Sequence, residues 1–447
     1  MKETQLQMPL PGVPRAKQGR EVPPRWGWTE ASVWTERMVA TLERGIKGGK
    51  WYSLIDKVWK RENLQSALRQ VQANGGAAGV DGLSCEAYRK DSPTRLQRVQ
   101  DKLQKGNYQP RPVKRVWIPK LGSKELRPLG VPTVEDRIVQ TALRNVIEPI
   151  FERIFAEHSY GFRPGRGAKD ALRRVDQRLK AGKVWVVDAD LKAYFDTIPQ
   201  APLMGRVEEQ IADRRVLELI EKLLQQGVME SAKGWQPTER GTPQGAVISP
   251  LLANLYLNPL DQMMAWQGQE MVRYADDFVI LCESQAKAQA VREQLRQWTA
   301  VAGLTLHPVK TRIIEASQKG GFDFLGYHFE RGHRWPRQKS RDKFRETIRQ
   351  QTGRRDPRPM KPIIAEVNRT LRGWFQYFQH SVRNVFASED RWVRQRLRTM
   401  LRRRHQGQGR ARGRDHQRWP NAYFAELGLF SLAIAREKAS HVRYRTH

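Results

Sequence analysis

Two acidic residues lie between two short apolar runs in the segment Met271–Cys282, which reads MVRYADDFVILC. The runs predict two strands of a hairpin, with Asp276 and Asp277 at the turn between them. An acidic pair in a turn is commonly a solvated turn and nothing more. Between two buried strands, however, the charges cost desolvation energy unless a cation compensates them. The segment therefore predicts a sheet with carboxylates at one end of its strands.

A second apolar strand is predicted at Lys183–Asp190, which reads KVWVVDAD and also ends in a carboxylate. Carboxylates at strand ends can hold two Mg²⁺ ions roughly 4 Å apart for in-line phosphoryl transfer. One ion then activates an attacking 3′-hydroxyl, and both stabilise the charge on the phosphoryl and leaving groups. The two segments favour this chemistry, although the acidic pair alone is a weak signal.

The remaining periodicity mixes helices and strands. Helical spacing predicts two or three helices between Ala31 and Asn74, and further helices at Asp136–Phe155, Val207–Leu224, Lys287–Ala302, Ile363–Phe378 and Val393–Leu401. Strand-like runs occur at Val113–Pro119 and at Phe322–Phe329, the latter a strand or a hairpin. The uncharged stretch Gly241–Leu260 contains three prolines and reads poorly as a membrane helix, so no membrane partner is expected.

The charge is large and unevenly distributed. The chain has 447 residues with 80 Lys and Arg against 47 Asp and Glu, a net charge of +33. Residues 331–447 hold 30 of the basic residues, of which 26 are Arg, and only 9 of the acidic ones. An excess of this size indicates a polyanionic partner, and the preference for Arg favours nucleic acid over an anionic membrane.

The cysteines point to a reducing compartment. Cys85 and Cys282 are the two in the chain, so no disulfide framework and no Cys-based zinc site is expected. The N-terminal residues lack the apolar run of a signal peptide. We therefore expect a cytoplasmic, nucleic-acid-associated protein.

The motifs around the carboxylates resemble those of a known family. In chain order they read AGVDG (78–82), IPK (118–120), RPLGVPTVEDRIVQ (127–140), SYGFRPGRGAKDAL (159–172), DLKAYFDTI (190–198), GTPQGAVISPLLANLYL (241–257), YADD (274–277) and FLGYHF (324–329). Their order and spacing resemble the bacterial group II intron-encoded reverse transcriptases, which also act as maturases. The likeness extends over about residues 50–430, and NRTLRGWFQYF (368–378) and DRWVRQRLRTMLRR (390–403) resemble the thumb and maturase domain.

The resemblance implies an α+β fold, a right-hand polymerase with fingers and a palm built on an antiparallel sheet, followed by an α-helical thumb. It divides the chain into an N-terminal arm and helical extension (1–74), fingers and palm (75–335), and a basic thumb/maturase domain with a tail (336–447). Longer members add an HNH nuclease with cysteine pairs. No such pairs occur here, so the resemblance is to the compact type that lacks this endonuclease.

The resemblance also implies the metal site. Asp190, Asp276 and Asp277 match the catalytic metal ligands, with Asp276 the more direct ligand of the pair, and the carbonyl of Leu191 adds a metal contact. Two Mg²⁺ ions are expected, with Mn²⁺ a substitute. Lys310 matches a lysine that either protonates the pyrophosphate leaving group or only holds charge there.

The nucleotide contacts follow in the same way. Lys120 and Arg127 would grip the incoming triphosphate, a solvated basic turn being the alternative. Phe195 would clash with a 2′-hydroxyl and so select dNTPs, unless it is an ordinary buried Phe. Gln244 would touch the nucleotide or the template backbone.

The implied function is RNA-directed DNA synthesis coupled to intron splicing and retrohoming. Its expected partners are group II intron RNA, an RNA template–DNA primer hybrid, dNTPs and target DNA. The candidate RNA-binding residues are Arg394, Arg396, Arg398, Arg402, Arg403 and Arg404, although part of this surface would be a solvated helix face. Two alternatives remain open: a reverse transcriptase serving CRISPR spacer acquisition or phage defence, and an RNA-binding splicing cofactor with dispensable polymerase activity.

Overall fold

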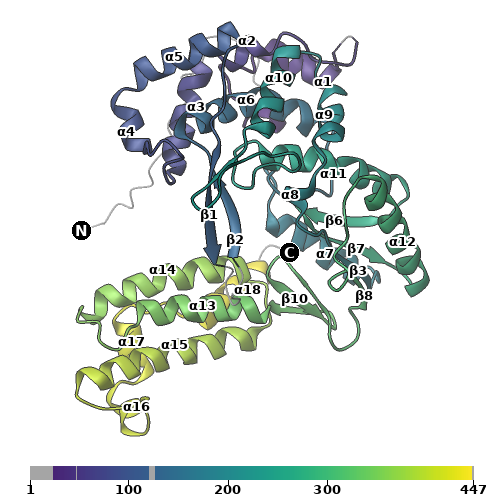
Figure 1. Cartoon of the computed structure of the whole chain (residues 1–447). Helices are drawn as coiled ribbons and strands as arrows, with labels where there is room; N and C mark the ends of the chain where they lie inside the picture. Colours follow the sequence, from purple (N-terminus) through teal and green to yellow (C-terminus); the bar gives the residue numbers. More distant parts are fainter. Residues whose placement is uncertain (1–23, 47, 120–125, 445–447) are drawn as a thin grey trace.

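The computed structural model describes residues 24–46, 48–119 and 126–444, and Figure 1 shows their arrangement. A helical block and a small sheet form one end, a second sheet with its covering helices lies beside them, and a bundle of helices forms the other end. The predicted antiparallel sheet followed by a helical domain is confirmed.

The N-terminal helices are α1 (Glu36–Arg44), α2 (Ile55–Val58) and α3 (Arg61–Asn74), which confirms the predicted two or three helices. They follow a 3₁₀ turn, η1 (Pro24–Trp26), and α2 and α3 pack on α6 (Val134–Glu152). Trp34 donates its Nε1–H to the carbonyl of Asn145 at 2.9 Å, and both are deep in the interior. One apolar core runs from Trp26 to Leu304, so residues 24–74 share the core of the chain that follows them.

The fingers sheet joins two hairpins that are distant in sequence. Strands β1 (Val113–Pro119) and β2 (Leu126–Val131) pair antiparallel, and β4 (Val228–Glu230) pairs antiparallel with β5 (Gly234–Gln236). A parallel contact between β1 and β4 completes the order β2-β1-β4-β5. The helices α4 (Cys85–Lys90) and α5 (Ser92–Lys105) precede this sheet.

The palm sheet carries the predicted acidic strands. Its strands are β3 (Trp185–Asp190), β6 (Glu270–Tyr274), β7 (Asp277–Cys282) and β8 (Arg312–Glu315), all antiparallel in the order β6-β7-β3-β8. Side chains alternate along β7, so Phe278 and Ile280 face α11 (Ser249–Trp266) and α12 (Gln285–Val301), whereas Val279 and Leu281 face α7 (Ala168–Lys180).

The helix predicted at Val207–Leu224 is wrong, because the chain divides there into α9 (Gln200–Glu208) and α10 (Arg214–Gln225), which follow α8 (Tyr194–Thr197). Asp213 causes the break. Its carboxylate accepts from the backbone N–H groups of Arg215 and Val216 at 3.1 and 3.2 Å, which caps α10. It also accepts from the N–H groups of Leu54 and Ile55, which ties this turn to the N-terminal helices.

The helices of the basic C-terminal region have their own apolar core, whereas the three-stranded sheet before them shares a cluster with the palm sheet. A sheet of β9 (Phe322–Phe324), β10 (Tyr327–Glu330) and β11 (His333–Pro336) leads into α13 (Gln338–Gln351), α14 (Met360–Phe378), α15 (Arg383–Arg404), α16 (Arg414–Arg418), α17 (Asn421–Glu426) and α18 (Leu432–Tyr444). The fully buried carboxylate of Glu389 binds Arg341 and Arg345, which joins α13 to α15. Within the described ranges, no helix is both long and apolar enough to cross a membrane.

Glu148 on α6 gives a testable stability prediction. Burial raises the pKa of this carboxyl to about 7, and Glu152 adds to the shift while Arg144 opposes it. Because the pKa is higher in the folded state, the folded protein binds more protons than the unfolded chain between about pH 4.5 and pH 7. The free energy of unfolding therefore falls as the pH rises through this range, and above pH 7 the ionised carboxylate destabilises the fold. Glu148→Gln should therefore raise the free energy of unfolding at pH 8 by about 1–3 kcal/mol.

Urea unfolding at pH 5 and pH 8 checks this prediction. The gain should fall to under about 1 kcal/mol at pH 5, and the exposed Glu43→Gln variant should show no such difference between the two pH values. An equal gain at both pH values would contradict the assignment to Glu148.

Candidate active site

The pairing of the palm strands brings the predicted carboxylates to one edge of the sheet. Asp190, the last residue of β3, is the antiparallel register partner of Asp277, the first residue of β7. Tyr274 pairs with Asp277 across the β6–β7 hairpin, so Ala275 and Asp276 form its two-residue turn. Ala275 has a φ of +60°, as tight hairpin turns of this kind require. The predicted hairpin with the acidic pair at its turn is thus confirmed.

The cluster disfavours its own negative charge. Burial raises the pKa of Asp276, and the neighbouring Asp190 raises it further, although Arg127 opposes both effects. Burial together with Asp188 and Asp276 raises the pKa of Asp277 to about 7, even though part of this residue is open to solvent. Carboxylates crowded in this way gain from a bound cation, which removes their mutual repulsion.

One cavity of about 480 Å³ gathers most of the predicted catalytic and nucleotide-binding residues. Its lining includes Arg127, Asp190, Leu191, Phe195, Gln244, Asp276 and Lys310. Lys120, also predicted to bind nucleotide, lies outside the described residues. Asp277 does not line the cavity, and the backbone N–H of Leu325 donates to its carboxylate instead.

The donor set suits a hard cation at Asp190 and Asp276. Within the part of the chain that is described, no three Asp, Glu, His or Cys side chains are close enough to hold an ion by themselves. Asp190, Asp276 and Leu191 nevertheless line the same cavity, so two carboxylate residues border one space. Mg²⁺ commonly uses one or two carboxylates together with water and substrate phosphates, so these residues fit it.

Lys310 reaches the cavity on a segment fastened to the end of β3. Its Nζ lies 2.5 Å from Oδ2 of Asp190, and the backbone N–H of His307 donates to the carbonyl of Asp190 at 2.7 Å. A bridge between Leu191 and Leu306 adds a third connection. The ammonium group of Lys310 therefore lies beside a carboxylate that would bind the metal ion accompanying the phosphates of a nucleotide.

Phe195 is held by its neighbours from two sides. Its ring meets that of Tyr194 edge-on at a centroid distance of 5.6 Å, and the hydroxyl of Tyr194 donates to the carbonyl of Ala253 at 2.6 Å. The N–H of Thr242 donates to the carbonyl of Phe195 at 2.7 Å. Phe195 is half-buried at the cavity wall, where a ring held in place can exclude ligands that are too large for the cavity.

Gln244 lies where the palm meets the fingers. Its carbonyl accepts from the N–H of Gly130 on β2 at 2.6 Å. Gly245 follows with a φ of +106°, and a Cβ there would lie 2.4 Å from the carbonyl oxygen of Gly130. This close approach of two backbones requires glycine.

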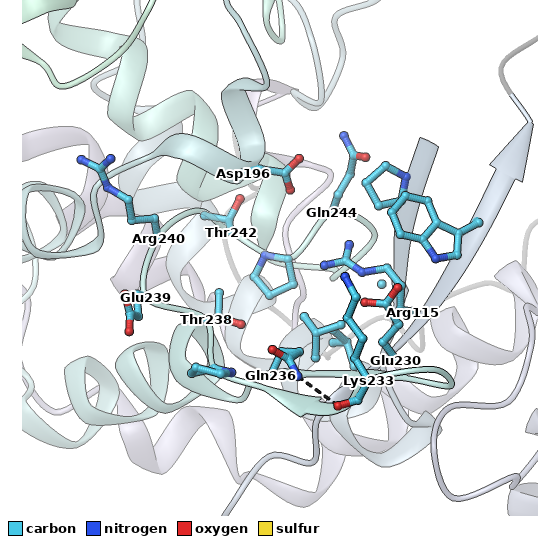
Figure 2. Close-up of a pocket in the computed structure, with 17 residues that line it drawn as sticks. Arg115, Asp196, Glu230, Lys233, Gln236, Thr238, Glu239, Arg240, Thr242 and Gln244 are labelled. Carbon is cyan, nitrogen blue, oxygen red and sulfur yellow. Dashed lines mark hydrogen bonds between the residues drawn. The ribbon is translucent and has the colours of Figure 1, made fainter. Parts of the chain in front are cut away.

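Figure 2 shows a second cavity, of about 330 Å³, with Asp196 and Gln244 at its upper side and Arg115 on the fingers strand. Pro128, Asp196 and Gln244 line both cavities and so form their shared wall. Burial raises the pKa of Asp196 against the pull of Arg115 and Arg127. Sequence reasoning assigned no role to Asp196 or Arg115, and the one signal for Asp196 is its place in DLKAYFDTI.

The predicted RNA-binding arginines fall into two groups. Arg394 and Arg403 make no side-chain hydrogen bond or ion pair with any described residue, and Arg403 is exposed. Arg396, Arg402 and Arg404 each donate to a backbone carbonyl within the domain. Arg398 departs from the prediction, because it is 5% exposed and donates to the carbonyl of Trp419 at 2.8 Å and to Asn421 at 2.6 Å. Its guanidinium closes the thumb core and is not available to RNA.

Comparison with known proteins gives two family matches. The family described as "Reverse transcriptase (RNA-dependent DNA polymerase)" matches residues 118–329. The family described as "Group II intron, maturase-specific domain" matches residues 341–419. The first match includes all residues of the cavity, and the second includes α14 and α15 of the thumb.

Relatives and solved structures extend these matches. Protein YkfC of Escherichia coli (strain K12) is 36% identical over 337 residues, which cover 66% of this chain and 87% of YkfC. The group II intron-encoded protein LtrA of Lactococcus lactis subsp. cremoris is 36% identical over 236 residues, covering 51% of this chain and 38% of LtrA. A chain of a partial Cas6-RT-Cas1–Cas2 complex has 25% identity and a TM-score of 0.36, over 55% of this chain and 42% of that one.

Proposed function

Because this chain belongs to the reverse transcriptases encoded by group II introns, with a maturase domain behind the polymerase, we propose that it copies RNA into DNA at the cavity bounded by Asp190 and Asp276. We further propose that it binds its intron RNA to assist splicing and copies that RNA during retrohoming into target DNA. The observation that carries the first proposal is the cavity itself, which joins a carboxylate at the end of β3 and one in the β6–β7 turn to a finger arginine, an aromatic ring and a lysine.

The chain's own groups divide the reaction among them. The primer 3′-hydroxyl would lose its proton to solvent water, and its oxygen would form a bond to the α-phosphorus of a dNTP. The bond between that phosphorus and the oxygen leading to the β-phosphate would break, so that pyrophosphate leaves. Asp190 and Asp276 would hold two Mg²⁺ ions, which when bound neutralise phosphate charge and lower the pKa of the 3′-hydroxyl. Arg127 presents a planar fork to the triphosphate. Lys310 is placed either to give a proton to the leaving pyrophosphate or to hold charge beside it.

Primer extension tests the proposal. The purified protein, given a DNA primer on an RNA template with Mg²⁺, should add dNTPs in template order. The proposal fails if the folded protein adds none under these conditions, and the same assay with Mn²⁺ tests whether that ion substitutes.

Phe195 should decide between dNTPs and NTPs. Phe195→Ala removes the ring that would meet a 2′-hydroxyl, so the preference for dNTPs should fall by about 10- to 100-fold through improved use of NTPs. The measurement is kcat/KM for dCTP and for CTP on the same primer–template.

Tyr194→Phe is the matched control for this prediction. It removes the hydrogen bond to the carbonyl of Ala253, next to Phe195, and should cost about 1 kcal/mol of stability without changing the preference for dNTPs over NTPs. If Phe195→Ala prefers dNTPs over NTPs as strongly as the wild type, Phe195 does not exclude the 2′-hydroxyl.

The splicing role rests on the thumb. The match to the maturase-specific domain covers residues 341–419, and Arg394 and Arg403 on α15 are left without a protein partner among the described residues. A-form RNA is bound mainly through phosphates and 2′-hydroxyls, for which free guanidinium groups are suited. Splicing of the intron RNA with and without the protein tests this role separately from DNA synthesis.

A further inference from the structure

Arg273, the fourth residue of β6, is a buried cation directly before the acidic turn. Its side chain is fully enclosed, with 1% of the residue exposed. A guanidinium group removed from water costs solvation free energy unless every part of it finds a partner. The hydrogen-bond partners of the Arg273 side chain therefore indicate its role.

Three neighbours satisfy this guanidinium. Nε and Nη2 donate to the two carboxylate oxygens of Asp261 at 2.7 and 2.5 Å. Nη1 donates to Oδ1 of Asn254 at 2.8 Å and to the backbone carbonyl of Ala275 at 2.8 Å. Asp261 and Asn254 are seven residues apart on α11, so they lie on one face of that helix. The guanidinium thus connects the helix under the palm to the catalytic turn.

The bond to Ala275 fixes one peptide plane. The carbonyl of Ala275 and the N–H of Asp276 belong to the same planar unit and point in opposite directions. While Arg273 holds the carbonyl toward the interior, the N–H of Asp276 faces the opposite way, and this peptide orientation fixes the backbone from which the Asp276 side chain reaches the cavity. We propose that Arg273, anchored by Asp261 and Asn254, is the positioning residue that sets the carboxylate of Asp276 in the cavity.

A second contact braces the turn from the same side. A Cβ on Gly161 would lie 2.3 Å from the backbone nitrogen of Ala275, so this loop lies directly against the turn. Nδ2 of Asn254 donates to the carbonyl of Gly161 at 2.7 Å. The N–H of Tyr160 donates to the carbonyl of Arg273 at 2.8 Å. Asn254 therefore ties the guanidinium and the bracing loop to one helix.

A buried ion pair can also serve stability alone, and the thumb offers one for comparison. The carboxylate of Glu389 is fully buried and binds Arg341 and Arg345 at 2.6 and 2.8 Å. This pair joins α13 to α15, and the loop that lies against Ala275 is not part of it. Glu389→Gln therefore disturbs a comparable pair without touching the acidic turn.

The inference rests on the proposed polymerase function, and its experiment separates the two. Arg273→Lys keeps the charge but cannot reach both Asp261 and Ala275, and Asp261→Asn leaves the guanidinium free to shift. Each variant should lower kcat for dNTP addition by about 100-fold while KM stays within about threefold, because the reacting groups are displaced and not the nucleotide contacts. Binding of Mn²⁺ to the free protein, followed by electron paramagnetic resonance, should weaken by about 10-fold.

Thermal unfolding of the same variants provides the control. Glu389→Gln should lose as much stability as Asp261→Asn while its kcat and Mn²⁺ affinity stay within about threefold of the wild type. Unchanged Mn²⁺ affinity in folded Arg273→Lys and Asp261→Asn would overturn the positioning role. If those two do not fold, Asn254→Ala, which spares the Asp261 pair, replaces them, and loss of folding in all three would also overturn it. A wild-type protein that binds Mn²⁺ but extends no primer would refute the proposed function alone.

Discussion

Replacing Asp276 by Asn is expected to lower DNA synthesis by on the order of 1,000-fold or more, the scale seen when a group that acts in the transition state is removed. Asn keeps the shape of the side chain but removes the charge that would hold a cation beside Asp190. The substitution also removes a charge that is costly to bury and is repelled by Asp190, the two effects that raise the pKa of Asp276. The folded protein should therefore be as stable as the wild type or more so. Activity and stability should therefore change in opposite directions.

Single-turnover primer extension and thermal unfolding measure the two effects. RNA binding and splicing should survive in Asp276→Asn, because they are assigned to the thumb. Asp277→Asn is the matched comparison, since this neighbouring carboxylate lies outside the cavity and should cost less activity than Asp276→Asn. Retained synthesis in Asp276→Asn would refute the assignment of this cavity as the active site.

Replacing Gly245 by Ala is expected to cost on the order of 100-fold in kcat/KM for dNTPs. The added Cβ would lie 2.4 Å from the carbonyl oxygen of Gly130 and 2.8 Å from Cδ1 of Leu129, and the φ of +106° is strained for any residue with a side chain. The strand and the Gln244 turn must therefore separate, which moves a cavity wall. The free energy of unfolding should fall by about 2–4 kcal/mol.

Gly234→Ala is the control for this substitution. Gly234 also has a positive φ, +71°, but nothing lies within 4 Å of its Cβ position. It should show only the backbone strain, with kcat/KM near the wild-type value. Equal losses in both variants would mean that backbone strain, and not the contact between palm and fingers, causes the effect.

The sequence predicted the acidic strands well because their signal is local. Lys183–Asp190 and Met271–Cys282 carry apolar runs and turn residues within a few positions, and both form the strands expected of them. Val207–Leu224 misled because apolar spacing continues across residues 209–213, where Asp213 is occupied by partners that include Leu54, more than 150 residues away. Periodicity cannot report a partner that is so distant in sequence.

The candidate site shows the same division between local and long-range information. Motif resemblance assigned roles to seven residues of the cavity, but not to Asp196. It also gave no role to Arg115, which lies on β1 in a second cavity that the parallel contact between β1 and β4 helps to form. The thumb arginines cannot be told apart by residue type, yet Arg398 is buried and Arg403 is exposed. Which guanidinium faces solvent is decided by the packing of α17 and the loop before it on α15, and not by the residue itself.

The order of the palm strands has a consequence for synthesis on the ribosome. β3 forms the middle of its sheet, but its two neighbours are β7 and β8, and β7 ends 97 residues after Trp185. At ordinary elongation rates the nascent chain therefore carries the apolar run Trp185–Ala189 unpaired on both edges for roughly 5–20 s. During that interval it is an open template for strands of other chains, and a delay in elongation between residues 190 and 277 would lengthen the exposure.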